Sequence, residues 1–385
     1  LPFNKERKLR AYQFMISKYL KSVLQSNPFV RKTIINEFDE DFSKPAILIA
    51  NHTSFLDILA IGMLHPKIIF LVNDWVYNSP VFGSAAKLAG AYPVSAGMEK
   101  GEEYLQEKVT QGFSLIAFPE GTRSNSSKIK RFHKGAFYLA EQFNLDLLPV
   151  LIHGNSEVLP KGSFIIRDGG ITVELLPRIK SDDKNFGNNY TERAKNIGSY
   201  FRMKFRKLRD EIETETYWQK TLLEHYRFKG DTVFSSVKKD FEQHKTTYKR
   251  ILELLGKKDS IVHISEDHGQ LALLLALDSI DRKIHVYLEN ADARKLLKNN
   301  FLTHQYSKIT VFDSVADALA QPSTVLVLDS EVLDIASIGK EKIAAFDTVV
   351  LLKKGMHAYI NVLQTMGFTI SEQEEHMTIL KITKS

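Results

Sequence analysis

The chain of 385 residues contains no cysteine, so disulfides, thiolate nucleophiles and thiolate metal sites are excluded. It also lacks any run of about 18 consecutive apolar residues, and we therefore expect no transmembrane helix. Hydrophobic residues still make up 43% of the chain, which is enough for real cores, and the length favours two domains over one. Because the first residue is Leu1 rather than methionine, we expect a fragment, a domain of a longer protein or a processed product.

Charge is distributed unevenly along the chain. Residues 1–210 hold 30 lysines and arginines against 21 aspartates and glutamates, a net charge of +9, whereas the remainder has a net charge of −3. A basic half is typical of a protein that contacts an anionic bilayer surface. Nucleic acid would also attract such a surface, but the chain has no recognition motif for it, so we expect no nucleic-acid partner.

The N-terminal segment contains a candidate amphipathic helix. Its basic residues come first: Lys5, Arg7, Lys8 and Arg10. Six residues with apolar side chains then fall on one helical face: Tyr12, Met15, Ile16, Tyr19, Leu20 and Val23. Two interpretations remain open, namely a helix that lies in the membrane interface and an ordinary helix packed on its own domain.

A histidine and an aspartate follow the apolar run Ala46–Ala50, which reads as a strand. The next seven residues are Asn51-His52-Thr53-Ser54-Phe55-Leu56-Asp57. A neutral imidazole suits the removal of a proton near physiological pH. Asp57 would hold the far ring nitrogen of His52 and stabilise the imidazolium that forms. This arrangement requires His52 to lie before a helix whose N-cap is Thr53 or Ser54, with Asp57 about one turn inside.

A second block follows another apolar run, residues 114–118. It reads Phe118-Pro119-Glu120-Gly121-Thr122-Arg123-Ser124. Arg123 carries a permanent charge and a rigid fork of donors that suits phosphate. Gly121 would let a substrate approach the main chain closely. The local alternative is an ion pair between Glu120 and Arg123. Since both blocks follow strands, they can meet at one end of a sheet.

Taken together, Asn-His-x-x-x-x-Asp and Phe-Pro-Glu-Gly-Thr-Arg-Ser, in this order and at this spacing, resemble the glycerolipid acyltransferase family. Its best known members are the 1-acylglycerol-3-phosphate acyltransferases. The resemblance covers roughly residues 12–210 and implies a mixed α/β sheet with flanking helices, in which His52 and Asp57 are catalytic. It implies that the substrate is bound by Asn51, Ser54, Glu120, Gly121, Thr122 and Arg123. Two weaker blocks, 132–136 and 148–154, agree with it.

The chain departs from this family in one place. Members usually carry an arginine shortly after a Gly-x-x-Phe-Ile segment, but the corresponding residues 90–96 contain none. Phosphate recognition must then depend on Arg123 together with neighbours such as Lys100 or Lys128. The basic run 128–131 could also meet lipid head groups or the phosphates of an acyl donor. The absent arginine leaves the identity of the acceptor open.

We place the domain boundary after residue 215, which gives domains 1–215 and 216–385. Alternating strand and helix patterns predict a doubly wound α/β sheet in the second domain. An amphipathic stretch, 232–255, precedes the first strand. The predicted strands are 260–264, 283–288, 309–312, 325–328, 348–352 and 377–382.

This second domain resembles the class I S-adenosylmethionine-dependent methyltransferases. It is most similar to the methyltransferase part of bacterial proteins that join a lipid exporter, a lysophospholipid acyltransferase and a methyltransferase. The resemblance rests on residues 226–230, on the strand, loop and helix that start at Ser260, and on Glu289 at the end of the second strand.

The cofactor loop of that family is degraded in this chain. The acid of the first strand is replaced by His263, and two of the three glycines by Ser265 and Asp267. Gly269 and Glu289 remain as candidate cofactor-binding residues. We nevertheless expect S-adenosylmethionine not to bind, and the domain to be a retained scaffold.

These observations predict an O-acyltransferase that moves a fatty acyl group from acyl-CoA or acyl carrier protein to a lysophospholipid of the 1-acylglycerol-3-phosphate kind. No further cofactor and no metal are expected. We expect peripheral attachment to anionic lipid at the cytoplasmic face of a bacterial inner membrane. Two alternatives stay open: a non-catalytic, membrane-associated assembly module of a lipid or pigment pathway, and a bifunctional acyltransferase–methyltransferase.

Overall fold

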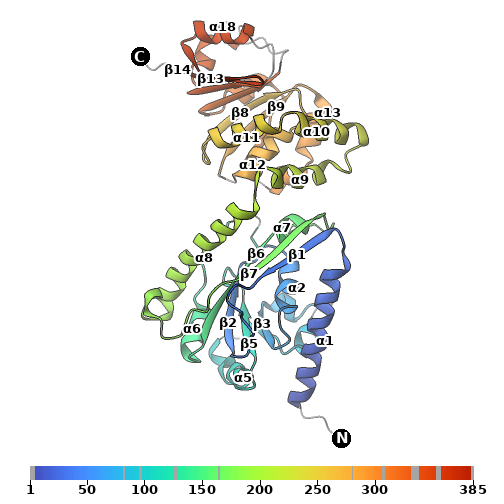
Figure 1. Cartoon of the computed structure of the whole chain (residues 1–385), viewed down its shortest axis with the longest axis vertical. Helices are drawn as coiled ribbons and strands as arrows, with labels where there is room; N and C mark the ends of the chain where they lie inside the picture. The colour runs from blue at the N-terminus through green and yellow to red at the C-terminus, as the bar shows by residue number, and fades with distance from the viewer. Residues whose placement is uncertain are drawn as a thin grey trace. The chain divides into compact units, whose positions relative to one another are not determined.

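The computed structural model describes residues 5–80, 83–94, 98–124, 128–163, 165–279, 281–305, 308–330, 338–352 and 357–382. The chain forms two compact units, Leu1–Ile212 and Glu213–Ser385, and each has its own seven-stranded sheet (Figure 1). The boundary expected after residue 215 falls inside the first helix of the second unit, α9 (Glu215–Tyr226). Within the described ranges, no helix has both the length and the apolarity that crossing a bilayer requires.

The sheet of the first unit is mixed, and this prediction is confirmed. Its strands are β1 (Val30–Ile35), β2 (Ala46–Ala50), β3 (Ile68–Val72), β4 (Tyr92–Pro93), β5 (Ser114–Ala117), β6 (Asp146–His153) and β7 (Gly169–Leu175). They lie in the order β1-β7-β6-β2-β5-β3-β4. The strands β6, β2, β5, β3 and β4 are parallel, whereas β7 runs antiparallel to β6 and pairs with β1. The carboxyl ends of β2, β5 and β6 therefore meet at one edge.

Helices cover both faces of this sheet, which explains why β2 is apolar throughout. Ile47 and Ile49 of β2 face one core cluster, and Leu48 faces the other. The helices of the unit are α1 (Lys5–Ser26), α2 (Leu56–Gly62), α3 (Asp74–Tyr77), α4 (Gly83–Leu88), α5 (Met98–Thr110), α6 (Gly135–Gln142), α7 (Asn155–Val158), α8 (Tyr190–Ile212) and a 3-10 turn, Lys184–Phe186. A strand buried on both sides is fixed in register, so the residues that follow it are held at the sheet edge.

The apolar residues of α1 that the sequence places on one face do not all have the same surroundings. The helix runs beside α2 (Figure 1), and the side chain of Leu20 lies against Gly62. A second stripe is exposed, and it consists of Tyr12, Met15, Tyr19 and Val23. The side of α1 that carries Leu20 thus packs on its own domain, which confirms that interpretation for this side. Membrane contact through the exposed stripe stays a prediction.

The second unit is a doubly wound α/β sheet, as predicted. Its strands are β8 (Ser260–Ser265), β9 (Lys283–Leu288), β10 (Ile309–Val311), β11 (Val325–Asp329), β12 (Thr348–Leu351), β13 (Phe368–Glu374) and β14 (Met377–Ile382). They lie in the order β10-β9-β8-β11-β12-β14-β13, and β14 runs antiparallel to both of its neighbours. The order reverses between β8 and β11, where such folds bind ligands.

Helices also cover both faces of the second sheet. One face carries α9, α10 (Asp231–Gln243), α11 (Lys245–Leu254), α12 (Gln270–Asp278), α13 (Ala291–Lys298) and α14 (Phe301–Gln305). The other face carries α15 (Val315–Leu319), α17 (Lys340–Ile343) and α18 (His357–Thr365). The amphipathic stretch 232–255 is two helices rather than one, because the chain breaks at His244.

Candidate active site

His52 and Asp57 lie between β2 and α2, at the carboxyl edge of the first sheet. His52 Nδ1 is 2.9 Å from Asp57 Oδ2. His52 precedes the helix, as the spacing requires, but α2 begins at Leu56, with Phe55 in the N-cap position. By its main-chain geometry the N-cap is therefore Phe55 rather than Thr53 or Ser54, and Asp57 is the second residue of the helix rather than one turn inside it.

The Asp57 carboxylate holds the turn before this helix. Its Oδ2 accepts hydrogen bonds from the main-chain amides of Thr53 (2.6 Å) and Ser54 (2.9 Å). The Ser54 hydroxyl accepts from the amide of Leu56, the first residue of α2, at 3.2 Å, which is the contact expected of a capping hydroxyl. Because Asp57 Oδ2 also accepts from His52 Nδ1, that nitrogen carries the proton of the neutral ring, and the lone pair is on Nε2. The Asp57 side chain is fully buried, whereas 17% of the His52 side chain is exposed, so the base alone reaches the surface.

A fourth donor to Asp57 comes from Asn155, a residue that no motif singles out. Its Nδ2 lies 2.6 Å from Asp57 Oδ1. An ionised carboxylate can only accept, so the amide group of Asn155 must face it. The buried Oδ1 of Asn155 then has no hydrogen-bond partner among the residues that the structure describes. Asn155 follows Gly154, where φ is 87° and an added Cβ would come within 1.8 Å of the carbonyl oxygen of Gly170. The position of Asn155 directly after the 148–154 block is the sequence signal that could have identified it.

The second motif closes around His52. The Phe118 ring stacks on the imidazole, with ring centroids 4.2 Å apart. The amide of Ser124 donates to the carbonyl of His52 at 2.8 Å. Both motifs therefore meet at one sheet edge, as their position after β2 and β5 predicts.

Two residues expected to bind substrate are part of the framework. Asn51 is fully buried, and its side chain exchanges two hydrogen bonds of 2.8 Å with the main chain of Ile152 on β6. Ser54 is fully buried as well, and its hydroxyl donates to the carbonyl of Leu159 at 2.7 Å. Their polar atoms fix the loop around His52, and substrate contact by these two residues stays a prediction.

Glu120 is a third such residue. Its two carboxylate oxygens accept from the main-chain amides of His52 (2.9 Å) and Lys130 (2.8 Å). Burial raises the pKa of Glu120, and these two amides oppose that rise. Glu120 makes no ion pair with Arg123 within the described ranges, so the local alternative is wrong. Glu120 therefore joins the two motifs, and its contact with a substrate stays a prediction.

Arg123 is the cation at this edge. Its guanidinium carbon lies 4.0 Å from the centre of the Phe55 ring, and the edge of Trp75 on α3 meets Phe55 at a centroid distance of 6.2 Å. Burial lowers the pKa of Arg123 and Asp57 opposes this, yet an arginine stays protonated. A partly desolvated cation held on an aromatic ring is prepared to accept an anion. Phe55 and Trp75 have no place in the sequence-based assignment.

Gly121 and Thr122 complete the acceptor loop, which we define as residues 120–124. Gly121 has a φ of 73°, a conformation that favours glycine. Its carbonyl accepts from Asn73 Nδ2 at 3.3 Å. Thr122 is exposed, and its hydroxyl accepts from Lys130 Nζ at 3.1 Å. Of the six residues expected to bind substrate, Gly121, Thr122 and Arg123 are the accessible ones.

The cations expected to assist Arg123 have different positions. Lys128 is exposed, and its carbonyl accepts from the Ser124 hydroxyl at 3.1 Å. The side chain of Lys100 and residues 95–97 of the departing segment lie outside the described residues.

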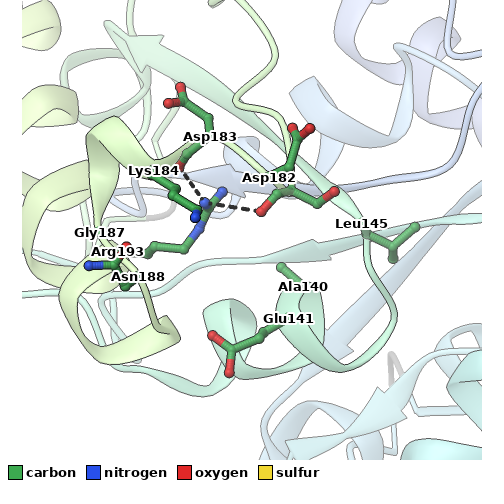
Figure 2. Close-up of a pocket in the computed structure, with 10 residues that line it drawn as sticks. Ala140, Glu141, Leu145, Asp182, Asp183, Lys184, Gly187, Asn188 and Arg193 are labelled. Carbon is green, nitrogen blue, oxygen red and sulfur yellow. Dashed lines mark hydrogen bonds between the residues drawn. The ribbon is translucent and has the colours of Figure 1, made fainter.

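A hollow elsewhere in the first unit is part of the framework. Figure 2 shows it lined by α6, by the segment 181–188 and by Arg193 of α8. The Arg193 guanidinium donates to the main-chain carbonyls of Lys180, Ser181 and Asp183. Arg193 is only 7% exposed. Its donors fix the loop, and the hollow contains none of the residues around His52.

At the carboxyl edge of the first sheet, a histidine that is hydrogen-bonded to a buried carboxylate lies beside a loop that carries an arginine. Residues 19–153 match the acyltransferase family model. The 1-acyl-sn-glycerol-3-phosphate acyltransferase of Cocos nucifera is 32% identical over 188 residues, which cover 47% of this chain and 59% of that protein. The Saccharomyces cerevisiae enzyme of the same description is 30% identical over 151 residues, 36% of this chain and 49% of that protein. The chain spans about half the length of the curated relatives it matches.

Two solved structures are similar to parts of this chain. The 1-acyl-sn-glycerophosphate acyltransferase PlsC from Thermotoga maritima has a TM-score of 0.45 and 21% identity, and the match covers 56% of this chain and 85% of that one. The precorrin-6y C5,15-methyltransferase of Geobacter metallireducens has a TM-score of 0.30 and 12% identity, over 37% of this chain and 89% of that one.

The loop after β8 is the one that the sequence compares with the S-adenosylmethionine loop of the methyltransferases. Three consecutive main-chain amides of this loop donate to side chains of the loop itself: Asp267 to Ser265 Oγ (2.9 Å), His268 to Gln270 Oε1 (2.9 Å) and Gly269 to Asp267 Oδ1 (2.8 Å). In a doubly wound fold the main-chain amides at this position face the ligand. Here the amides of residues 267, 268 and 269 already donate to side chains of the same loop.

The two remaining cofactor candidates serve the packing and hydrogen bonding of the unit itself. Gly269 has a φ of 84°, and an added Cβ would approach the Leu297 side chain to 2.8 Å, so the turn into α12 and its packing require glycine. Glu289 accepts from the Ser330 hydroxyl, which also lies 3.2 Å from Glu266. His263, which stands where the family has an acid, is fully buried, and burial lowers its pKa.

Proposed function

We propose that the first unit is an O-acyltransferase that transfers a fatty acyl group from acyl-CoA or acyl carrier protein to a lysophospholipid of the 1-acylglycerol-3-phosphate kind. The observation that carries the proposal is the His52–Asp57 pair inside a segment that matches the acyltransferase family. Relatives described as 1-acyl-sn-glycerol-3-phosphate acyltransferases support this choice of acceptor.

The geometry suits direct transfer without an acyl-enzyme. His52 Nε2 takes the proton of the acceptor hydroxyl as its oxygen attacks the thioester carbonyl carbon. Asp57 accepts from Nδ1 and stabilises the imidazolium. The tetrahedral intermediate then collapses, the carbon–sulfur bond breaks, and the thiolate takes the proton back from His52. The products are an ester and a free thiol, and the base is regenerated.

The test supplies purified protein with mixed lysophospholipid acceptors and with acyl-CoA or acyl carrier protein donors, and identifies the lipids by mass spectrometry. A diacyl phospholipid that retains the acceptor's phosphate is the expected product. Transfer only to acceptors without phosphate would contradict the assigned acceptor, and no transfer with any pair would support an assembly module.

The exposed stripe of α1 supports peripheral attachment to an anionic bilayer as part of this proposal. Met15 and Tyr19 are 59% and 67% exposed, and the exposed Lys8 precedes them on the same side of the helix. Apolar side chains entering the interface beside a cation are typical of interfacial helices. The cytoplasmic face of a membrane, where anionic lipid is abundant, is the location we propose.

Replacement of Met15 and Tyr19 by serine should lower binding to vesicles that contain phosphatidylglycerol by about tenfold or more, because two apolar side chains no longer enter the interface. Vesicle flotation measures the bound fraction. Phe228→Ser, which changes a side chain that is 82% exposed in the second unit, is the control and should leave flotation unchanged. Equal flotation of the Met15/Tyr19 variant and the unchanged protein would show that α1 is not the contact.

We further propose that the second unit is a scaffold without methyltransferase activity, since its loop amides are satisfied internally. Calorimetric titration with S-adenosylmethionine should give no saturable heat even at millimolar concentration. Saturable binding that Glu289→Ala abolishes would overturn this proposal and favour a bifunctional enzyme.

A further inference from the structure

A segment outside both motifs, residues 154–163, is attached to the site at three points. Asn155 donates to Asp57. The carbonyl of Leu159 accepts from the Ser54 hydroxyl. Lys161 Nζ then lies 3.3 Å from the carbonyl oxygen of Arg123. The segment therefore brings a second cation to the acceptor loop.

Lys161 remains able to bind a ligand in this position. It is exposed, and an ammonium group has three donors, of which the carbonyl of Arg123 uses one. Within the described residues, neither Lys161 nor the guanidinium of Arg123 forms an ion pair with a carboxylate. The Arg123 side chain covers Phe55, the residue after Ser54, and the Lys161 segment is hydrogen-bonded to Ser54. Arg123 and the segment that carries Lys161 thus contact neighbouring residues, Phe55 and Ser54.

The charge of a phosphate monoester calls for such a pair. It carries about −1.5 to −2 at neutral pH, so one arginine leaves part of the charge unbalanced. Residues 90–96 hold no arginine that could supply the second positive charge. We propose that Lys161, from the loop after α7, is the second phosphate-binding cation of the acceptor site and makes the enzyme selective for acceptors with a phosphate monoester. This inference rests on the proposed function.

The neighbourhood of Lys161 in the chain matches an amphiphilic acceptor. Ile165 and Ile166 follow it closely and are 62% and 49% exposed. A cation followed by exposed isoleucines offers charge to a head group and apolar surface to an acyl chain or to the bilayer that holds it. A small water-soluble phosphate ester would use only the first of these.

Steady-state kinetics of the full chain test the assignment. Lys161→Ala should raise the KM for 1-acylglycerol 3-phosphate about tenfold, the loss of one charge-assisted contact, and leave the KM for the thioester donor unchanged. With 1-acylglycerol, which lacks the phosphate, the variant and the unchanged protein should react equally. Lys161→Arg should restore most of the affinity. Lys207→Ala, which removes another exposed lysine of the same unit, from α8, is the control and should change neither KM.

A binding titration separates this inference from the proposed function. The ligand is a short-chain 1-acylglycerol 3-phosphate without any acyl donor, and the readout is heat of binding. Tighter binding by the unchanged protein than by Lys161→Ala supports the site even if no acyl transfer is ever detected. Equal binding and equal KM values overturn the role of Lys161 while leaving an active acyltransferase in place.

Discussion

His52→Ala should lower kcat by about 10²–10⁴-fold, the usual contribution of a positioned general base. The reason is that Nε2 of His52 is the nitrogen left for the acceptor proton once Asp57 has accepted from Nδ1. His52→Gln should be equally inactive, because an amide cannot take the proton. The measurement is the rate of thiol release from acyl-CoA at saturating acceptor.

His65→Ala is the matched control for this result. His65 stacks on Phe42 and accepts from the amide of Lys67, so its loss removes an imidazole from the same unit without touching the His52–Asp57 pair. It should keep kcat near that of the unchanged protein. Circular dichroism must show both histidine variants folded. A folded His52→Ala protein with near-normal turnover would sink the proposed mechanism.

The catalytic pair could be predicted because it is local. His52 and Asp57 are five residues apart, after a strand whose unbroken apolar sequence marks it as buried. Asn155 could not be found in this way, since it reaches Asp57 from 98 residues further along the chain. Its position depends on the pairing of β6 with β2, which no local pattern reveals.

The same limit hides the structural role of two residues that were assigned to the substrate site. Asn51 and Glu120 belong to blocks that resemble a substrate site, but the sequence does not show which polar atoms are buried. Both are used to join main-chain segments. A buried polar group needs a hydrogen-bond partner, and in both cases a main-chain group of a neighbouring segment is that partner.

The strands of the second sheet were mostly predictable because parallel strands buried on both faces are continuously apolar. The exception is β13, an edge strand whose side chains are mostly exposed and polar. The break at His244 divides a stretch that stays amphipathic on both sides, so its periodicity alone predicts one helix rather than α10 and α11.

Asp57→Asn should separate catalysis from stability. An asparagine can turn its carbonyl oxygen toward the amides of Thr53 and Ser54 and its amide group toward Asn155. Asn155 can then reverse its own amide, because its buried Oδ1 has no partner in the present arrangement. The fold should therefore persist, while kcat falls on the order of 10³-fold because the imidazolium loses its negative partner.

Asp57→Ala should instead lose both activity and stability. It leaves four donors without an acceptor, from Thr53, Ser54, His52 and Asn155, and each buried unsatisfied group costs about 1–3 kcal/mol. Denaturant unfolding followed by circular dichroism should show the alanine variant well below the asparagine variant. Asp210→Asn, an exposed carboxylate on α8, is the control and should change neither quantity. Equal stability of Asp57→Asn and Asp57→Ala would contradict this expectation. It would mean that water satisfies the donors around residue 57 in the alanine variant, and that Asp57 contributes to catalysis through His52 but not to stability.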